Sequence, residues 1–238
     1  MKSTSILLLM IFAAANAAAS DYEEVRELGL GSRGIDTLRV DNGSGYVEIV
    51  GVDGLDEISI TATLVLEDTG AEKAKKIIES DLVLTLDENS DSVVLTAYFE
   101  RKRLFNFGSS GLVNLDIRMP SRMHLDMDDG SGSIKIDGVH GDISVDDGSG
   151  SLALANVGGQ VIIDDGSGSI SARGVGGDLS INAGSGSIKV YDTAGSVTVD
   201  DGSGSINVQD VENDLIIVDD GSGSLDYSGI SGDVITDS

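Results

Sequence analysis

The chain has no cysteine and no tryptophan, and aromatic residues make up 4% of its 238 residues. Without cysteine it can form no disulfide bond and can carry no lipid on a cysteine behind a leader sequence. Enzymes that cleave polysaccharides on a β-helix need a wide groove, often with aromatic platforms for sugar rings. A carbohydrate-active enzyme is therefore the least favoured function for this chain.

Positive charge is also scarce, with 15 Lys and Arg against 41 Asp and Glu and a net charge of −26. Nucleic acids and anionic lipid surfaces repel such a chain, so we expect neither as a partner. No segment beyond the N-terminus is apolar enough to span a bilayer, so we also expect no membrane insertion of the mature protein. The expected partner is an envelope protein or a surface ligand whose identity the sequence does not give.

The first 20 residues have the pattern of a signal peptide. Lys2 supplies the positive start, Ile6 to Ala15 form a short apolar stretch, and small residues at 15–19 offer cleavage sites. The apolar stretch is too short to anchor the chain in a membrane. We therefore expect an exported protein, located in a periplasm or at the cell surface.

Six copies of one short sequence motif fill the second half of the chain. Their starts are 18 residues apart, except that the last interval is 19. A short strict period indicates one structural unit stacked on itself. The copies begin at Asp128, Asp146, Asp164, Asn182, Asp200 and Asp219, and most read Asp-Asp-Gly-Ser-Gly-Ser followed by Ile or Leu.

Each copy alternates apolar and polar residues twice, which is typical of two half-buried strands. In the first copy the apolar positions are Ile134, Ile136, Val139, Ile143 and Val145, and glycine-rich corners separate the two strands. Stacked in register, these positions form aliphatic columns along the stack. The sequence thus predicts an all-β fold, a flattened single-chain β-solenoid with 18-residue turns and two short strands per turn.

Residues 21–127 precede the tandem repeats of 128–238 and have a less regular pattern. Residues 35–53 resemble one diverged repeat, because Asn42-Gly-Ser-Gly45 matches the later corners. We expect 55–127 to cap the end of the stack, since an open solenoid end exposes unpaired backbone groups. The expected elements are strands at 58–66, 80–86, 92–99 and 112–118 and one short helix at 71–79.

Three features resemble the adhesin-like β-strand-repeat domains of bacterial exported proteins. They are the early segment 38–49, the strand 115–120 with its continuation into the first repeat, and the tandem alternation of Gly-Asp-Ile/Leu with Gly-Ser-Ile. The resemblance covers roughly residues 35–238. It implies an exported β-solenoid of largely unassigned function, and it implies no catalytic residues.

The paired aspartates are the candidate metal ligands, because stacked copies would align them in two ladders on one corner. We expect both ladders to be solvent-exposed. Ca²⁺ takes six to eight oxygen ligands, which such a corner could offer, so a calcium-dependent surface protein is one alternative. Asn182-Ala183 interrupts both ladders, however, and the spacing is not that of a calcium-binding loop or nonapeptide repeat. We therefore expect no metal to be required. The candidates are Asp128, Asp129, Asp146, Asp147, Asp164, Asp165, Asp200, Asp201, Asp219 and Asp220.

The remaining motifs do not indicate catalysis or a cofactor. Gly29 to Gly34 match the dinucleotide fingerprint, but we expect neither the strand before it nor the helix after it that this motif requires. The chain has no Gly-x-Ser-x-Gly elbow, and His140 takes a corner position where we expect exposure. Phe105 and Phe107, within a basic segment, are expected to pack over the cap. The leading hypothesis is a non-enzymatic structural or adhesin-like binding module.

The last repeat is a further candidate interaction site. Leu225, Tyr227, Ile230 and Val234 continue the aliphatic columns, and the outer rung could pair with a strand of a partner or of a second copy. The aspartates nearby, at positions 226, 233 and 237, should make such self-association weak.

The leader generates a direct prediction. Mass spectrometry of the native protein should find a mature N-terminus between Ala18 and Asp21, because the small residues there satisfy signal peptidase. A full-length chain that stays in the cytosol would contradict export.

Overall fold

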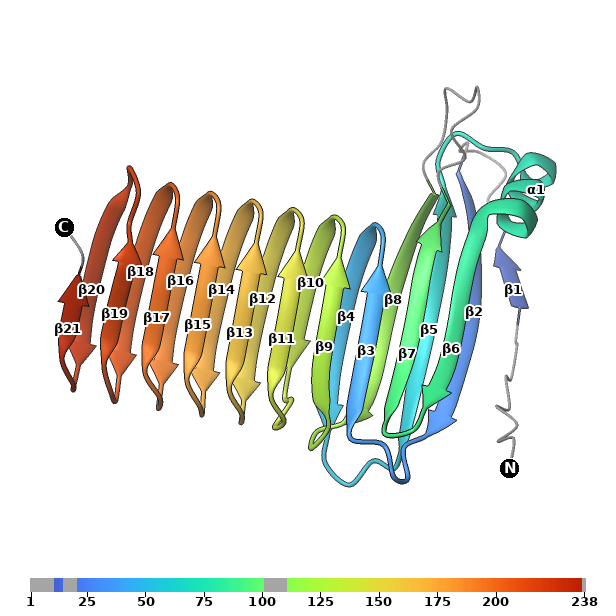
Figure 1. Cartoon of the computed structure of the whole chain (residues 1–238). Coiled ribbons are helices and arrows are strands. Elements are labelled where there is room, and N and C mark those ends of the chain that lie inside the picture. Colours follow the sequence, from blue (N-terminus) through green and yellow to red (C-terminus); the bar gives the residue numbers. More distant parts are fainter. Residues whose placement is uncertain (1–10, 15–20, 101–110, 237–238) are drawn as a thin grey trace.

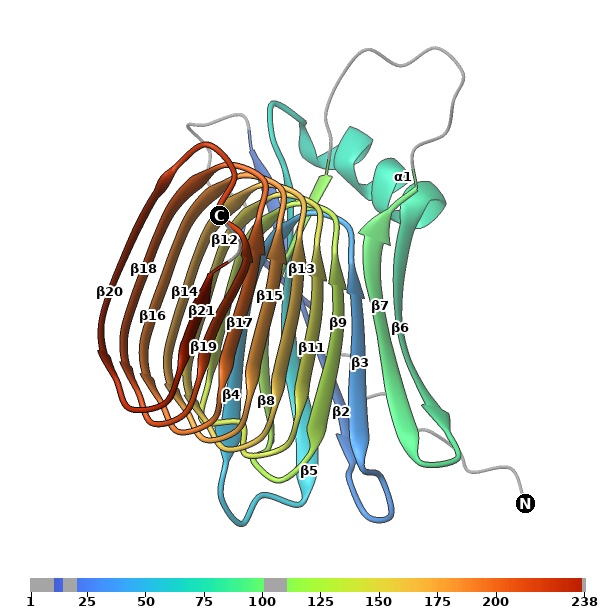
Figure 2. The same cartoon turned by 60° about the vertical axis from the view of Figure 1, so that its left-hand side comes forward.

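A computed structural model describes residues 11–14, 21–100 and 111–236 of the chain. Two β-sheets of 11 and 10 strands face each other and are wound from one chain (Figures 1 and 2). The strands form a β-solenoid of about six turns with about 18 residues per turn. The predicted fold class is therefore confirmed.

Each turn of the rod, here called a rung, places one strand in each sheet. Along the 10-stranded sheet these are β9 (His124–Asp129), β11 (Ile143–Asp147), β13 (Val161–Asp165), β15 (Leu179–Ala183), β17 (Val197–Asp201), β19 (Leu215–Asp219) and β21 (Val234–Thr236). Along the 11-stranded sheet they are β10 (Gly132–Asp137), β12 (Gly150–Val157), β14 (Gly168–Val175), β16 (Gly186–Thr193), β18 (Gly204–Val211) and β20 (Ser224–Ile230).

Neighbouring rungs pair in parallel and in register. Gly150 lies opposite Gly132 on one side and opposite Gly168 on the other, so equivalent residues of successive repeats are stacked. Gly150 has φ of 148°, and a Cβ added there would run into the carbonyl oxygen of Gly132. From Gly45 to Gly204 the second glycine of each corner is required, because it allows both this backbone conformation and the close approach of the next rung.

The diverged repeat forms the first rung of the stack. Its strands are β3 (Thr37–Asn42) and β4 (Gly45–Val52), which pair in parallel with β9 and β10. Asn42 lies opposite Asp129, and Gly45 lies opposite Gly132. The corner motif at residues 42–45 is therefore stacked directly on the first regular corner.

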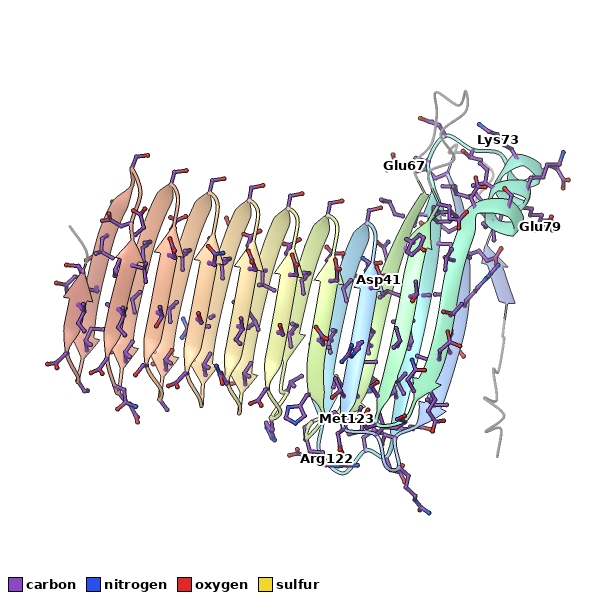
Figure 3. The ribbon with its side chains drawn as sticks, in the orientation of Figure 1. Asp41, Glu67, Lys73, Glu79, Arg122 and Met123 are labelled. Atoms are coloured by element: carbon purple, nitrogen blue, oxygen red, sulfur yellow. The ribbon has the colours of Figure 1, made fainter. Side chains whose placement is uncertain are left out.

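Beyond the first rung, the chain leaves the stack and builds the cap before it returns to β9. The cap contains β5 (Glu57–Leu66), helix α1 (Ala71–Asp81), β6 (Leu82–Asn89), β7 (Ser92–Phe99) and β8 (Gly111–Pro120). Strands β7 and β8 pair in parallel with β3 and β4, so the cap extends both sheets away from the repeats. Figure 3 shows Lys73 and Glu79 on the helix at one end of this cap.

The predicted cap elements are found with small shifts at their ends, and one prediction is wrong. Residues before Gly29 were expected not to form a strand, but β2 (Tyr22–Gly31) is a ten-residue strand that includes Gly29 and Gly31. It pairs antiparallel with β5 and with β1 (Ile11–Ala14), which lies within the expected leader. A strand rather than a helix follows, so the dinucleotide motif is still not formed.

The predicted inward positions form the hydrophobic core between the sheets. The five positions are fully buried in the first repeat, and their equivalents are buried through Ile217. In the last rung the same positions are less covered, with Tyr227 44% and Val234 38% exposed, because no described residues stack on their outer side. Burial thus depends on having a rung on both sides.

A charge placed in one column should destabilise the rod severely. Val161 is fully buried between Ile143 and Leu179, and Val161→Asp would bury an unpaired carboxylate there. We expect its melting temperature to drop by many degrees, while Gln160→Asp, on an exposed neighbour, stays close to wild type. Equal shifts for the two variants would show that the inward assignment is wrong.

Candidate functional site

The corner formed by Asp-Asp-Gly-Ser-Gly carries the candidate metal ligands, and the structure separates them into two rows. The outer row is solvent-exposed and consists of Asp128, Asp146, Asp164, Asp200 and Asp219. The inner row faces the interior, where Asp129, Asp147, Asp165 and Asp201 are at most 2% exposed, whereas the last candidate, Asp220, is only half-buried. The expectation that both ladders are exposed is therefore wrong for the inner row, because adjacent strand residues point to opposite faces of a sheet.

In the inner row, typically only one of the two carboxylate oxygens of each aspartate accepts a hydrogen bond. Oδ1 of Asp147 accepts a hydrogen bond from the backbone N–H of Ser149 at 3.1 Å, and Asp165 does the same with Ser167 at 3.1 Å. Each of these bonds closes a tight turn at the corner. No hydrogen-bond partner within the described residues reaches Oδ2 of Asp129, Asp147 or Asp201.

In the first rung a neutral residue takes the inner position. Asn42 takes the inner position there, and its Nδ2 donates a hydrogen bond to Oδ1 of Asp129 at 2.8 Å. Ala183 takes the same position in the interrupted rung and is also buried. A neutral residue is thus compatible with the corner at two of its levels.

Burial changes the protonation of the inner row. It raises the pKa of both Asp129 and Asp147 to about 6, and negative neighbours in adjacent rungs add to the effect. Burial raises the pKa of Asp165 and Asp201 as well, against the lowering effect of their backbone hydrogen bonds. With pKa values of about 6, Asp129 and Asp147 are therefore partly protonated at mildly acidic pH.

In the part of the chain that the structure describes, no three His, Asp or Glu side chains gather closely enough to hold a metal ion. The outer aspartates are aligned rung by rung, with Asp128 opposite Asp146 and Asp146 opposite Asp164, but they project from one face into solvent. Whether Ca²⁺ binds along this row remains a prediction to be tested.

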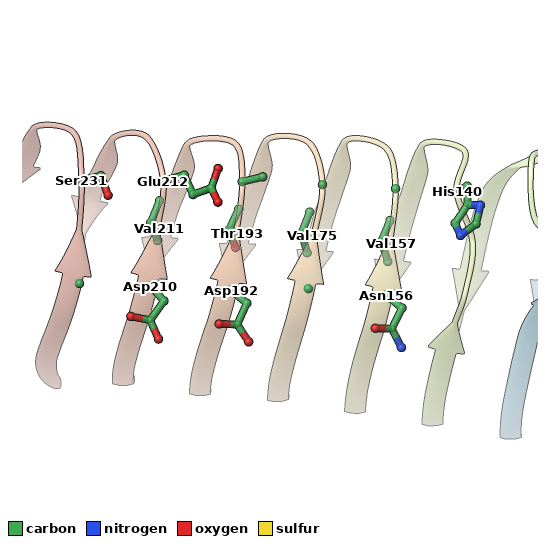
Figure 4. A pocket seen from close by; sticks show the side chains of 15 residues that line it. His140, Asn156, Val157, Val175, Asp192, Thr193, Asp210, Val211, Glu212 and Ser231 are labelled. Atoms are coloured by element: carbon green, nitrogen blue, oxygen red, sulfur yellow. The ribbon is translucent and has the colours of Figure 1, made fainter.

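The opposite corner contains a groove that the sequence analysis missed. It has a volume of about 610 Å³ and runs along the rod from His140 to Ser231 (Figure 4). These residues belong to the first and last of six successive corners, so the groove is about 24 Å long at a rung spacing of about 4.8 Å. Small residues open it in the middle, where Gly158, Gly176 and Ala194 follow one another.

Acidic side chains and one buried hydroxyl line this groove. Asp192 forms an ion pair with Arg173 at 3.7 Å, whereas the carboxylates of Asp210 and Glu212 have no ionic or hydrogen-bond partner among the described residues. Thr193 occupies a column position that other rungs fill with valine or isoleucine, is 1% exposed, and has no partner for Oγ1. The small residues are visible in the sequence, but each one by itself indicates only a turn.

Several other candidates can be placed or set aside. His140 is exposed, as predicted, and its Nδ1 lies 3.6 Å from Oδ1 of Asp53. The Oγ of Ser121 donates to the same oxygen at 2.6 Å, so this cluster joins the first regular corner to the cap. Phe105 and Phe107, Asp237, and most of the leader lie outside the described residues.

Comparison with solved structures supports the predicted resemblance at the level of the fold. A candidate adhesin from Bacteroides fragilis aligns over 90% of this chain and 97% of its own, with 12% identity and a TM-score of 0.50. A candidate lipid-binding protein from Parabacteroides distasonis aligns over 90% and 94%, with 18% identity and a TM-score of 0.43. A candidate cell adhesion protein from Clostridium sporogenes aligns over 90% and 100%, with 8% identity and a TM-score of 0.39.

A scan of family models and a search of curated proteins found no match. No helix in the described ranges is long and apolar enough to cross a membrane. At a TM-score of 0.50, the chain is thus similar in fold to a solved protein that carries the name of a candidate adhesin.

The inner row predicts that acid stabilises the protein. The folded-state pKa of Asp147 is about 6, above the ordinary value of 3.8, so the folded state binds protons that the unfolded state releases. The free energy of unfolding should therefore rise as the pH falls from 6 towards 4, and should be lower above pH 6. Thermal melts followed by circular dichroism at several pH values measure this directly.

Asp147→Asn should raise the melting temperature at pH 7, by roughly 2–4 °C for each kcal/mol recovered, and should flatten the pH dependence. The asparagine can keep the turn hydrogen bond and can donate to a neighbouring aspartate, as Asn42 does. Asp146→Asn, an exposed neighbour, removes the same charge and serves as the control. If both variants behave alike, reduction of net charge rather than the buried row explains the effect.

The broken ladder predicts that the fold does not depend on metal. The protein should keep a β-type circular dichroism spectrum in excess chelator, with only a modest thermal gain in millimolar Ca²⁺, because the outer carboxylates project separately into solvent. A chain that is unfolded in chelator would instead favour the calcium-dependent alternative.

Proposed function

We propose that this protein is a non-enzymatic, exported binding module of the bacterial cell envelope or surface, an adhesin-like rod that holds its partner along its side. One observation carries the proposal: a single groove crosses six successive rungs on one corner. A partner lying in it would contact equivalent positions of several repeats, so many weak contacts would add up.

The architecture supports a binding role in a second way. In the 11-stranded sheet the rungs from β12 to β20 are held in register, so the groove is largely formed before a partner arrives. A preformed site loses less conformational entropy on binding than a flexible one. The solved protein with a TM-score of 0.50 carries the name of a candidate adhesin, in line with this role.

Export rests on the leader at residues 1–20. Removal of the leader would also remove β1 and free the outer edge of β2, the strand with which it pairs. Self-association through β20 and β21 stays a separate prediction, and the proposed lateral binding does not require it.

The groove can be filled without disturbing the core. Ala194 is exposed in the groove, and Ala194→Trp would occupy its middle. Asn182→Trp adds the same bulk to an exposed position in the neighbouring strand β15, near the opposite corner. Labelled mature protein should co-sediment with washed envelopes of the producing bacterium, and the groove variant should lose most of this binding while the control keeps it.

Melting curves must first show that both variants fold like the wild type. Equal envelope binding by both variants would mean that the groove is not the binding surface. Absence of binding by the wild type, in both envelope and whole-cell assays, would contradict the adhesin-like role itself.

A further inference from the structure

The groove has a chemical character that narrows the choice of partner. Its charged side chains are Asp192, Asp210 and Glu212, and among the described residues His140 is the only basic one that lines it. Arg173 offsets part of the charge of Asp192, but Asp210 and Glu212 are left without a partner in the described structure. The whole chain adds a net charge of −26 around them. The field in the groove therefore attracts a cationic ligand.

The backbone along the groove offers little to a ligand. The N–H groups of Gly158, Gly176, Ala194 and Glu212 each donate to a carbonyl oxygen in the preceding rung. Recognition must therefore come mainly from side chains. The carboxylates supply charge, while the small residues between them let a ligand chain approach the rod closely.

A second, independent feature of the same groove is the hydroxyl of Thr193. Its rung could carry valine, as the rungs on either side do at Val175 and Val211. The threonine instead leaves Oγ1 buried without a partner, which costs stability in the free protein. Figure 4 shows Thr193 in the row of column residues between Val175 and Val211, beside Asp192 and Glu212.

We propose that the groove binds an extended, basic segment of a partner protein, with lysine or arginine side chains directed at Asp192, Asp210 and Glu212. The segment lies along the rod axis, and a length of about 24 Å accommodates about seven residues in an extended conformation. Because Oγ1 of Thr193 is covered in the free structure, a polar group of the bound segment partners it only once this side chain turns toward the groove. This inference rests on the proposed function and specifies the partner of that site.

A labelled heptapeptide of alternating lysine and serine is a suitable probe, followed by fluorescence anisotropy at low salt. The wild type should bind it, and a peptide with glutamine in place of lysine should not bind. Asp210→Asn combined with Glu212→Gln should weaken binding by about tenfold or more. Asp164→Asn combined with Asp200→Asn removes the same charge from the outer aspartate row and should change binding by less than about twofold.

Thr193→Val tests the hydroxyl with a side chain that the neighbouring rungs already accept. It should raise the melting temperature of the free protein and weaken binding of the lysine peptide by several-fold. Unchanged binding would show that the Thr193 hydroxyl does not contribute to peptide binding. Equal losses for the two double variants would overturn the proposal, since the peptide would then be responding to the general charge of the rod.

Failure of this inference can be told apart from failure of the proposed function. If Ala194→Trp abolishes envelope binding but the lysine peptide neither binds nor competes, the groove is a binding site for a partner of different chemistry. If the peptide binds in the groove and also displaces the envelope partner, both the site and its cationic ligand are supported.

Discussion

The repeat region of this protein depends on the parallel stacking of one rung of about 18 residues on the next. A single rung buries too few side chains to offset the entropy of ordering its backbone, so rungs are stable only together. Stacking aligns the aliphatic columns, provides the backbone hydrogen bonds between rungs, and repeats each corner along the rod. The last rung shows that burial depends on stacking, because Tyr227 and Val234 are exposed there while the equivalent residues of inner rungs are buried.

The same stacking also lowers stability at one corner, because it buries like charges close together. Because strand residues alternate between faces, the second aspartate is forced inward at Asp129, Asp147, Asp165 and Asp201, and stacking then places like charges at neighbouring levels. The turn hydrogen bonds explain why aspartate is used at Asp147 and Asp165. The raised pKa of each carboxyl group shows that burial disfavours its charged form. Asn42 and Ala183 are neutral members of the same row, so the charge is not needed at every level.

The periodic part of the fold could be predicted from the sequence because its signals are local and repeated. The strand alternation, the corner glycines and the match of Asn42-Gly-Ser-Gly45 to later corners all correspond to stacked positions. Strand β2 was missed because Glu23, Glu24 and Glu27 hide its alternation, although Glu24 is buried and ion-paired with Arg26. The groove could not be predicted, since it arises only when the small corner residues of six rungs are brought together.

The register of stacking can be measured directly, because the chain contains no cysteine of its own. Ser169 and Ser187 lie opposite each other in adjacent rungs, with their Oγ atoms 3.2 Å apart. A Ser169→Cys, Ser187→Cys variant should form an intramolecular disulfide on mild oxidation, since in-register strands bring the two Cα atoms within bonding range. Ser169→Cys with Lys189→Cys, displaced by two residues, should stay reduced. Rapid oxidation of the displaced pair, with the aligned pair left free, would contradict the stacked register on which the whole account is built.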